Sequence, residues 1–151
     1  MKITPDILAL VRDVMTARIP FNAFLGIRVD ELDNGFARLS IPFRDEYIRD
    51  AARPALHGGV ISTLIDTAGG AAVWTTVNRL DRVSTIDLRV DYLRPGRAET
   101  LIAEARVVRT GNRVGVVTVR AFHASAPSAT VADGKAVYNI KRGPGHDFES
   151  T

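Results

Sequence analysis

The chain has 151 residues, 46% of them hydrophobic and 25% charged, which is the composition of one globular domain and not of a disordered segment. It has no cysteine, so disulfides, thiolate zinc sites and a cysteine nucleophile are excluded. The net charge is +3, but the 20 basic residues are interleaved with 17 acidic ones and form no basic run of the kind that marks a nucleic-acid-binding arm.

The first twenty residues predict an amphipathic helix. Thr4 stands in the position of an N-cap and Pro5 in the first helical position, and apolar residues follow at helical spacing. Asp6 and Asp13 lie among the apolar residues, which argues against a signal peptide, and no apolar run is long enough to span a membrane. We place Pro20 beyond the helix and expect a cytoplasmic protein without a membrane partner.

A hairpin is predicted next. Residues 24–32 alternate between apolar and polar side chains, Asp33-Asn34-Gly35 is a strong turn signal, and residues 36–41 form a second strand. Residues 43–56 are polar and contain a proline, so we interpret them as a loop.

A long buried helix and four strands complete the pattern. Residues 57–79 carry apolar side chains on most sides at helical spacing, so this helix should be buried. Four strand-like segments follow, and Asp133-Gly134 is a bulge or a tight turn inside the last of them; the segments lie near residues 83–94, 98–109, 113–124 and 129–141.

This order of elements predicts an α+β fold in which an antiparallel sheet covers one central helix. We expect a single domain over residues 1–151, with residues 1–20 as an N-terminal helix and residues 143–151 as a tail. Because one helix gives the sheet little cover, a second subunit would extend the sheet and add to that cover.

The central helix begins with a motif suited to binding an oxyanion, His57-Gly58-Gly59. The first N–H groups of a helix have no partner inside the helix and lie at the positive end of its dipole. Glycine lets a ligand approach the backbone closely, which stabilisation of a developing oxyanion requires. A plain turn into a helix is the alternative interpretation.

Asp66 is the candidate base or nucleophile. It lies mid-helix after Ile65, in the most apolar part of the chain, where a carboxylate is costly unless it is paired or solvated by a cavity. Carboxylates held in such clefts are candidates for acid–base or nucleophilic chemistry. The alternative is a carboxylate on a narrow exposed stripe with Ser62 or Asn78.

Gly69-Gly70 interrupts the same helix at a cost of about 1 kcal/mol per glycine relative to alanine. Close contact with another helix or with the sheet would explain the pair, and a flexible spot without function is the alternative.

Gly58 and Asp66 are eight residues apart, or about 12 Å along the helix axis, which is too far for both to act on one carbonyl from the same chain. If both are catalytic, a second subunit must bring its Asp66 to the first subunit's Gly58, and the glycine pair would assist that approach.

These motifs resemble a known family. His57-Gly58-Gly59 followed by Asp66, and then a strand that ends in Leu93-Arg94-Pro95, is similar to the phenylacetate-degradation (PaaI-type) branch of the hotdog-fold thioesterases over roughly residues 20–142. The resemblance implies hydrolysis of an acyl-CoA thioester with no cofactor other than the coenzyme A of the substrate. It also implies a homodimer or a dimer of dimers with the site between subunits.

The resemblance further implies roles for single residues. Asp66 would be the nucleophile or general base, the N–H of Gly58 would polarise the thioester carbonyl, and His57 would support that site beside Gly59. Thr85, or its neighbour Ser84, would place the attacking water. The family often carries an asparagine six residues before the histidine, where this chain has Ala51 with Asp50 beside it.

Three arginines near predicted strand ends, Arg94, Arg97 and Arg113, are candidates for contacts with the phosphates of coenzyme A. Solvated surface arginines are the alternative interpretation of each.

Two other functions stay open. A hydratase or dehydratase acting on acyl thioesters would use His57 as its acid–base group, and its product would differ in unsaturation with the thioester intact. A non-catalytic acyl-CoA-binding protein on the same fold would be indifferent to loss of Asp66. A metal-dependent hydrolase is not expected, because His57, His123 and His146 are the only histidines and none are paired at helical spacing.

Overall fold

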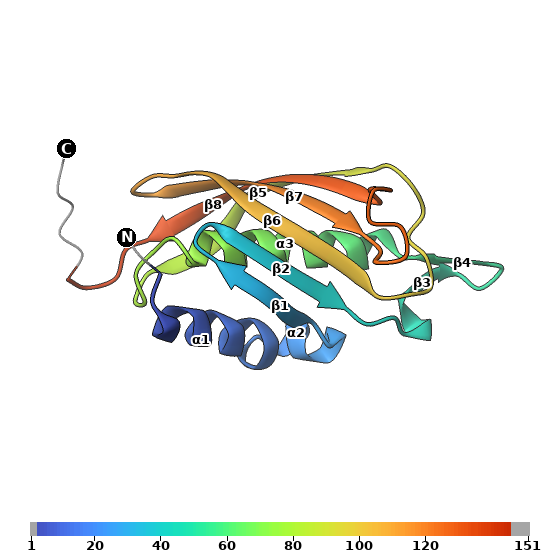
Figure 1. Cartoon of the computed structure of the whole chain (residues 1–151), viewed down its shortest axis with the longest axis horizontal. Helices are drawn as coiled ribbons and strands as arrows, with labels where there is room; N and C mark the ends of the chain where they lie inside the picture. Colours follow the sequence, from blue (N-terminus) through green and yellow to red (C-terminus); the bar gives the residue numbers. More distant parts are fainter. Residues whose placement is uncertain (1–2, 146–151) are drawn as a thin grey trace.

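A six-stranded antiparallel sheet curves around the long helix α3 (Gly58–Trp74) in the computed structural model of the chain, which describes residues 3–145 (Figure 1). The strands lie in the order β1-β2-β6-β7-β8-β5. Their bounds are Arg28–Asp33 for β1, Phe36–Ile41 for β2, Arg82–Tyr92 for β5, Leu101–Thr110 for β6, Val114–Phe122 for β7 and Ala132–Lys141 for β8. The predicted α+β architecture, a hotdog fold with one central helix, is confirmed.

Helix α3 is buried, as its apolar surface predicts. The side chains that it buries include Leu64, Ile65 and Val73, which pack into the core with the inner faces of the strands. The helix ends at Trp74 and not at the predicted residue 79, because the hydroxyls of Thr75 and Thr76 donate at 2.7 Å to the carbonyls three residues before them.

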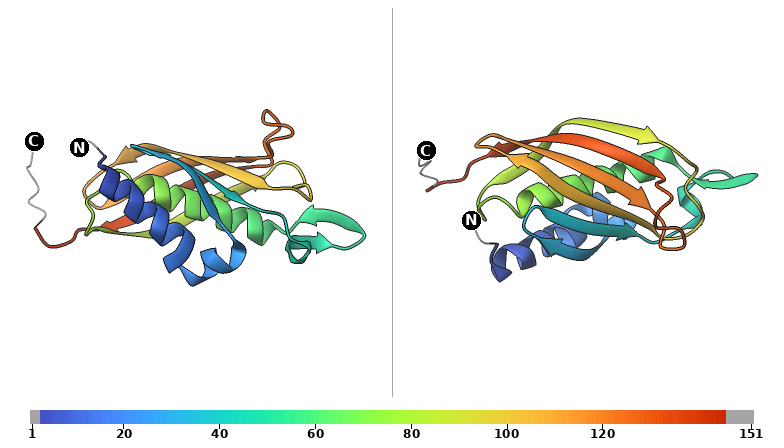
Figure 2. Two further views of the ribbon diagram at one scale, coloured as in Figure 1. Left: turned by 60° about the horizontal axis from the view of Figure 1, so that its bottom comes forward. Right: turned by 45° about the horizontal axis from the view of Figure 1, so that its top comes forward.

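The N-terminal segment begins with the predicted helix. Helix α1 (Pro5–Asp13) starts after the N-cap Thr4, whose Oγ1 accepts a hydrogen bond from Ile7 N at 3.4 Å. The chain continues as a π-helical segment over Val14–Arg18. Figure 2 shows this segment running alongside α3, and it contributes Met15 to a cavity that α3 also lines.

A second short helix follows where the sequence indicated the end of helical structure. The predictions that Pro20 lies beyond the helix and that a strand begins at Phe24 are wrong, because Pro20 begins helix α2 (Pro20–Leu25). Proline fits the first helical position, since its missing N–H has no intrahelical partner there. Gly26, with φ of +69°, ends this helix in the left-handed conformation, and β1 begins only afterwards.

Two hairpins follow in the chain. The β1–β2 turn at Asn34-Gly35 is confirmed, with φ of +71° at Gly35. The prediction that residues 43–56 form a plain loop is wrong, because a 3-10 helix (Asp45–Tyr47) leads there into a small hairpin of β3 (Ile48–Asp50) and β4 (Arg53–Leu56). Pro54 is tolerated because both strands of a two-stranded hairpin are edge strands.

The last four strands lie within a few residues of the predicted segments. Asp133-Gly134 forms neither a turn nor a bulge, and the β5–β8 register is continuous through it. A Cβ on Gly134 would lie 2.5 Å from Ile65 Cγ2, so this glycine serves the close packing of β8 on α3.

The edges of the sheet are β1 and β5. Strand β5 is the longest strand of the sheet and exposes Ile86 and Tyr92, and Leu93, just after it, is exposed as well. In the part of the chain that the structure describes, no helix is long and apolar enough to cross a membrane. Of the predicted tail, residues 146–151 lie outside the described residues, as does His146.

Candidate active site

The N-terminus of α3 leaves one backbone donor unused. His57 is the N-cap, and its Nδ1 accepts a hydrogen bond from Gly59 N at 2.9 Å. The carbonyl of His57 accepts from Val60 N at 3.0 Å and from Ile61 N at 3.4 Å. Among residues 3–145, no acceptor lies on the N–H of Gly58. This donor lies at the positive end of the α3 dipole, where it can stabilise a negatively charged oxygen.

Tyr92 covers Gly58 from the end of β5. Its hydroxyl donates to Gly58 O at 3.1 Å, and a Cβ on Gly58 would lie 3.3 Å from the tyrosine ring. Tyr92 is itself 53% exposed. Sequence reasoning did not identify Tyr92, although it lies inside the strand motif that carried the family resemblance.

The carboxylate of Asp66 is held through one of its two oxygens. Oδ1 accepts hydrogen bonds from Thr85 Oγ1 at 2.8 Å and from the Tyr138 hydroxyl at 3.2 Å. Among the described residues, Oδ2 has no partner. Asp66 is half-buried and held from β5 and β8, so the alternative of an exposed stripe with Ser62 does not hold. The free oxygen is the one that can take a proton from water or attack a carbonyl.

Tyr138 is the site residue that sequence reasoning missed. Its side chain is 1% exposed, and its hydroxyl also donates to the backbone carbonyl of Asp66 at 2.7 Å. Burial, and then the neighbouring carboxylate of Asp66, raises the pKa of this hydroxyl far above its ordinary value. Tyr138 therefore remains a neutral donor. In the sequence it occupies an inward position of an alternating strand, which is typical of a core residue.

Gly69 and Gly70 make room for this tyrosine. A Cβ on Gly69 would overlap the Tyr138 hydroxyl and lie 3.0 Å from Val117 Cγ2, and a Cβ on Gly70 would lie 3.4 Å from Tyr138 Cε1. The interpretation of close contact between helix and sheet is thus confirmed, and that of a flexible spot is wrong. The pair contacts β7 and β8 of its own chain.

Two cavities meet beside α3. One, of about 280 Å³, lies at Asp66 and is otherwise largely apolar; it is lined among others by Met15, Ile19, Phe21, Trp74, Val83, Ser84 and Thr85. The other, of about 580 Å³, lies at His57 and Gly59. Phe21 and Thr63 line both cavities. Of the two predicted hydroxyl residues, Thr85 binds Asp66, and Ser84 lines the same cavity.

Gly58 and Asp66 lie on one unbroken helix, as predicted. The rise of an α-helix separates them by about 12 Å along its axis. A single chain therefore does not bring the free N–H and the free carboxylate oxygen to the same reacting carbonyl.

The three predicted arginines do not lie together. Arg94 Nη1 donates to Thr130 O at 2.6 Å and Arg97 Nη1 to Ser125 Oγ at 3.2 Å, so both belong to the β5–β6 connection near Gly58. Arg113 follows β6 and lies at the opposite end of that ten-residue strand, about 30 Å away.

Ala51, where the family often has asparagine, lies at the exposed tip of the β3–β4 hairpin. Its neighbour Asp50 accepts a hydrogen bond from Ala52 N at 2.9 Å, so that carboxylate serves the hairpin turn.

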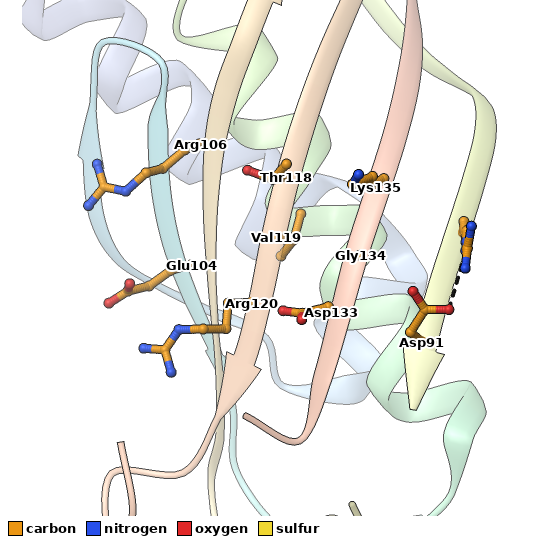
Figure 3. Close-up of a pocket in the computed structure, with 10 residues that line it drawn as sticks. Asp91, Glu104, Arg106, Thr118, Val119, Arg120, Asp133, Gly134 and Lys135 are labelled. Atoms are coloured by element: carbon orange, nitrogen blue, oxygen red, sulfur yellow. Dashed lines mark hydrogen bonds and ion pairs between the residues drawn. The ribbon is translucent and has the colours of Figure 1, made fainter. Parts of the chain in front are cut away.

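A third hollow, of about 410 Å³, lies on the outer face of the sheet, which separates it from α3 (Figure 3). Strand register places Arg38, Glu104, Arg120 and Asp133 side by side on β2, β6, β7 and β8. Positive and negative charges therefore alternate across these strands, which is the interleaving that the sequence indicates.

Comparisons with known proteins identify the family of the chain. The family model described as the thioesterase superfamily matches residues 54–128. The medium/long-chain acyl-CoA thioesterase YigI of Escherichia coli (strain K12) is 38% identical over 125 residues, which cover 74% of this chain and 81% of YigI.

Solved structures give the same result. A thioesterase family protein from Silicibacter pomeroyi is 29% identical with a TM-score of 0.83, over 91% of this chain and 99% of that one. The PaaI protein of E. coli, from the phenylacetic acid degradation operon, has a TM-score of 0.80 over 91% of this chain and 96% of that one. At 24% identity its likeness shows the fold alone, so the PaaI-type branch stays a prediction. The chain belongs to the thioesterase superfamily, which confirms the predicted class of enzyme, a thioester hydrolase.

Proposed function

We propose that this protein hydrolyses acyl-CoA thioesters to the free acid and coenzyme A, with Asp66 as base or nucleophile and the N–H of Gly58 as oxyanion donor. The observation that carries the proposal is the state of the Asp66 carboxylate. Thr85 and Tyr138 hold its Oδ1, while Oδ2 has no partner among the described residues and the group lies at a largely apolar cavity. Such a carboxylate is oriented and only partly solvated, as a general base requires.

The apolar cavity beside Asp66 suits the acyl group. Its walls include Met15, Ile19, Phe21 and Trp74, whose largely apolar side chains can pack against an acyl chain. The relative YigI is named a medium/long-chain acyl-CoA thioesterase, and we propose substrates of that kind for this protein. On the strength of the sequence motifs we also propose that the protein belongs to the PaaI-type branch. We propose the cytoplasm as its location.

The site is completed by a second copy of the chain. One subunit would supply Gly58 and the other Asp66, because about 12 Å along one helix separates them. The support lies at strand β5, which is a long sheet edge with Ile86 58% exposed. Such an edge is a template for pairing with another strand. We propose a homodimer with two equivalent sites, or a dimer of such dimers.

Coenzyme A would lie with its phosphates toward the β5–β6 connection, which carries Arg94 and Arg97 close to Gly58. Each of the two guanidinium groups donates through its Nη1 to a neighbouring oxygen atom. The other N–H groups of each are left for phosphate oxygens. Coenzyme A enters as part of the substrate, and we propose that no further cofactor is needed; chelation with EDTA should leave the rate unchanged.

The test is release of free thiol from a panel of aryl and straight-chain acyl-CoAs. We expect release by the wild type and a loss of 10²-fold or more in kcat in Asp66→Asn, the usual scale for a general base, with substrate binding retained. Asp30→Asn, at an exposed position within β1, is the matched control and should keep the wild-type rate. Near-normal turnover by Asp66→Asn would refute the role of Asp66.

The same panel separates the other two functions. A change in unsaturation with the thioester intact would indicate a hydratase or dehydratase. Binding without any turnover by the wild type would indicate an acyl-CoA-binding protein.

A further inference from the structure

His123 is a buried histidine outside the candidate site. It follows β7 directly and is 3% exposed. Its Nε2 lies 2.9 Å from Arg97 N, and its Nδ1 lies 2.9 Å from Thr100 O. A backbone N–H can only donate and a carbonyl can only accept, so Nε2 must be the acceptor and Nδ1 must carry the proton. Both contacts therefore require the neutral ring.

The two contacts hold the connection between β5 and β6, residues 93–100. The start of this connection is held elsewhere, where Val131 O accepts hydrogen bonds from Leu93 N at 2.9 Å and Arg94 N at 3.2 Å. Its second half is held by His123 through Arg97 and Thr100.

The connection in turn holds the chain just before Gly58. Gly96, next to Arg97, accepts a hydrogen bond from Leu56 N at 2.9 Å through its carbonyl. The contact is close, since a Cβ on Gly96 would lie 3.0 Å from Leu56 Cβ. Leu56 directly precedes His57-Gly58, so a shift of Gly96 is transmitted to the first residue of α3.

A second bond holds the N-terminus of α3 from the other side. His57 N donates to Tyr47 O at 2.7 Å. The two residues before Gly58 are thus held by the carbonyls of Gly96 and Tyr47. Loss of either hydrogen bond would let the N–H of Gly58 move. An oxyanion donor must lie about 3 Å from the developing charge, so a small displacement is costly to catalysis.

We propose that His123 is a positioning residue for the oxyanion donor, acting through Arg97, Gly96 and Leu56 on the N–H of Gly58. This inference rests on the proposed function. It makes the rate depend on a residue that touches neither substrate nor Asp66.

The support requires one protonation state of the ring. Protonation of Nε2 removes the acceptor for Arg97 N and sets two N–H groups against each other. The charged groups that face the ring are Glu99, whose Oε1 lies 3.6 Å from Nδ1, and Arg97, whose guanidinium reaches Ser125 Oγ at 3.2 Å. Ser125 also donates to Glu99.

Three variants test the proposal by thiol release. In His123→Ala we expect kcat to fall about tenfold, less than complete loss of an oxyanion donor, with KM changed by less than about threefold. In His123→Gln the amide oxygen can accept from Arg97 N, so kcat should return to within about twofold of wild type. Ser125→Ala alters a neighbour of the ring without touching either ring nitrogen and should keep the wild-type kcat.

The division of the effect between kcat and KM gives a second readout. A wild-type kcat in His123→Ala would overturn the proposal, as would a loss confined to KM or a His123→Gln variant as slow as His123→Ala. The glutamine variant keeps the test decisive if His123→Ala fails to fold.

Amide hydrogen exchange separates this inference from the proposed function, because it needs no substrate. The N–H groups of Leu56 and Arg97 should exchange faster in His123→Ala than in the wild type. Equal exchange rates would overturn the role of His123 even in an active thioesterase. An absence of thiol release by the wild type would instead refute the proposed function.

Discussion

The hydroxyl of Tyr138 lies against Gly69, in the space that any side chain at that position would fill, and from there it donates to Asp66. The glycine is therefore part of the support of the carboxylate. It lets a strand residue reach into the central helix at the turn that bears Asp66, and the tyrosine replaces the packing that the helix loses.

Gly69→Ala and Gly70→Ala should have opposite effects on stability. Both replace a helical glycine, a change worth about 1 kcal/mol in favour of the variant. A Cβ at position 69 would overlap the Tyr138 hydroxyl, whereas at position 70 it would lie 3.4 Å from Tyr138 Cε1, close to ordinary contact. We expect a net loss of about 1–3 kcal/mol for Gly69→Ala, and no loss or a small gain for Gly70→Ala. Urea unfolding measures both, and equal values would contradict the packing described here.

Tyr138→Phe should change both rate and alkaline stability. The variant removes one donor from the Asp66 carboxylate but keeps Thr85, so we expect kcat to fall about tenfold, the worth of one hydrogen bond of about 1.4 kcal/mol.

The effect on stability has a definite sign. The pKa of Tyr138 is raised in the folded state from an ordinary value of 10.0, first by burial and then by Asp66. Above pH 10 the unfolded chain loses this proton and the folded chain keeps it, so the contribution of Tyr138 to stability is present below pH 10 and declines as the pH rises further. Between pH 9 and 11 the wild type should lose about 1.4 kcal/mol more in total than Tyr138→Phe, with the steeper part of the loss above pH 10. Parallel urea titrations of the two proteins between pH 9 and 11 measure this difference, and equal slopes would contradict it.

The sequence predicted the central helix and the last four strands well, because each carries a clear apolar period and the strands are separated by turn residues. It failed where proline was taken only as a terminator. Pro20 begins a helix, and Pro54 lies in an edge strand. Periodicity does not distinguish these uses of proline, which depend on whether the missing N–H faces a partner.

The residues of the candidate site that local sequence patterns mark were predicted. Glycines at a helix start and a carboxylate in an apolar helix are visible along the chain, so Gly58 and Asp66 were found. Tyr138 was not found, because it lies 72 residues after Asp66 and occupies an inward position of an alternating strand, as any core residue does. Only the packing of β8 on α3 brings its hydroxyl to the carboxylate.

Gly58→Pro should remove the oxyanion donor with little change in the fold. Proline lacks the N–H but suits the first helical position. The residue before a proline must be extended, and His57 already has φ of −61° and ψ of 135°. We expect kcat to fall by 10²–10³-fold, the usual effect of losing one such donor. Gly58→Ala is the matched control, since it brings a similar Cβ contact with Tyr92 and keeps the N–H. If both variants lose activity equally, crowding by Tyr92 and not loss of the donor would be the cause.

Mixed oligomers of two inactive variants test whether the site is shared between subunits. Asp66→Asn retains Gly58, and Gly58→Pro retains Asp66. If one site draws Gly58 from one subunit and Asp66 from the other, a mixed dimer contains one site with both groups intact and one with neither. Random reassembly from equal amounts gives about half mixed dimers, so about a quarter of the wild-type activity should return. The two variants are unfolded and refolded together, with each refolded alone as the control, and thiol release is measured per subunit. If Gly58 and Asp66 acted within one chain, every subunit of the mixture would still carry a defect, and the mixture would be as inactive as its parents.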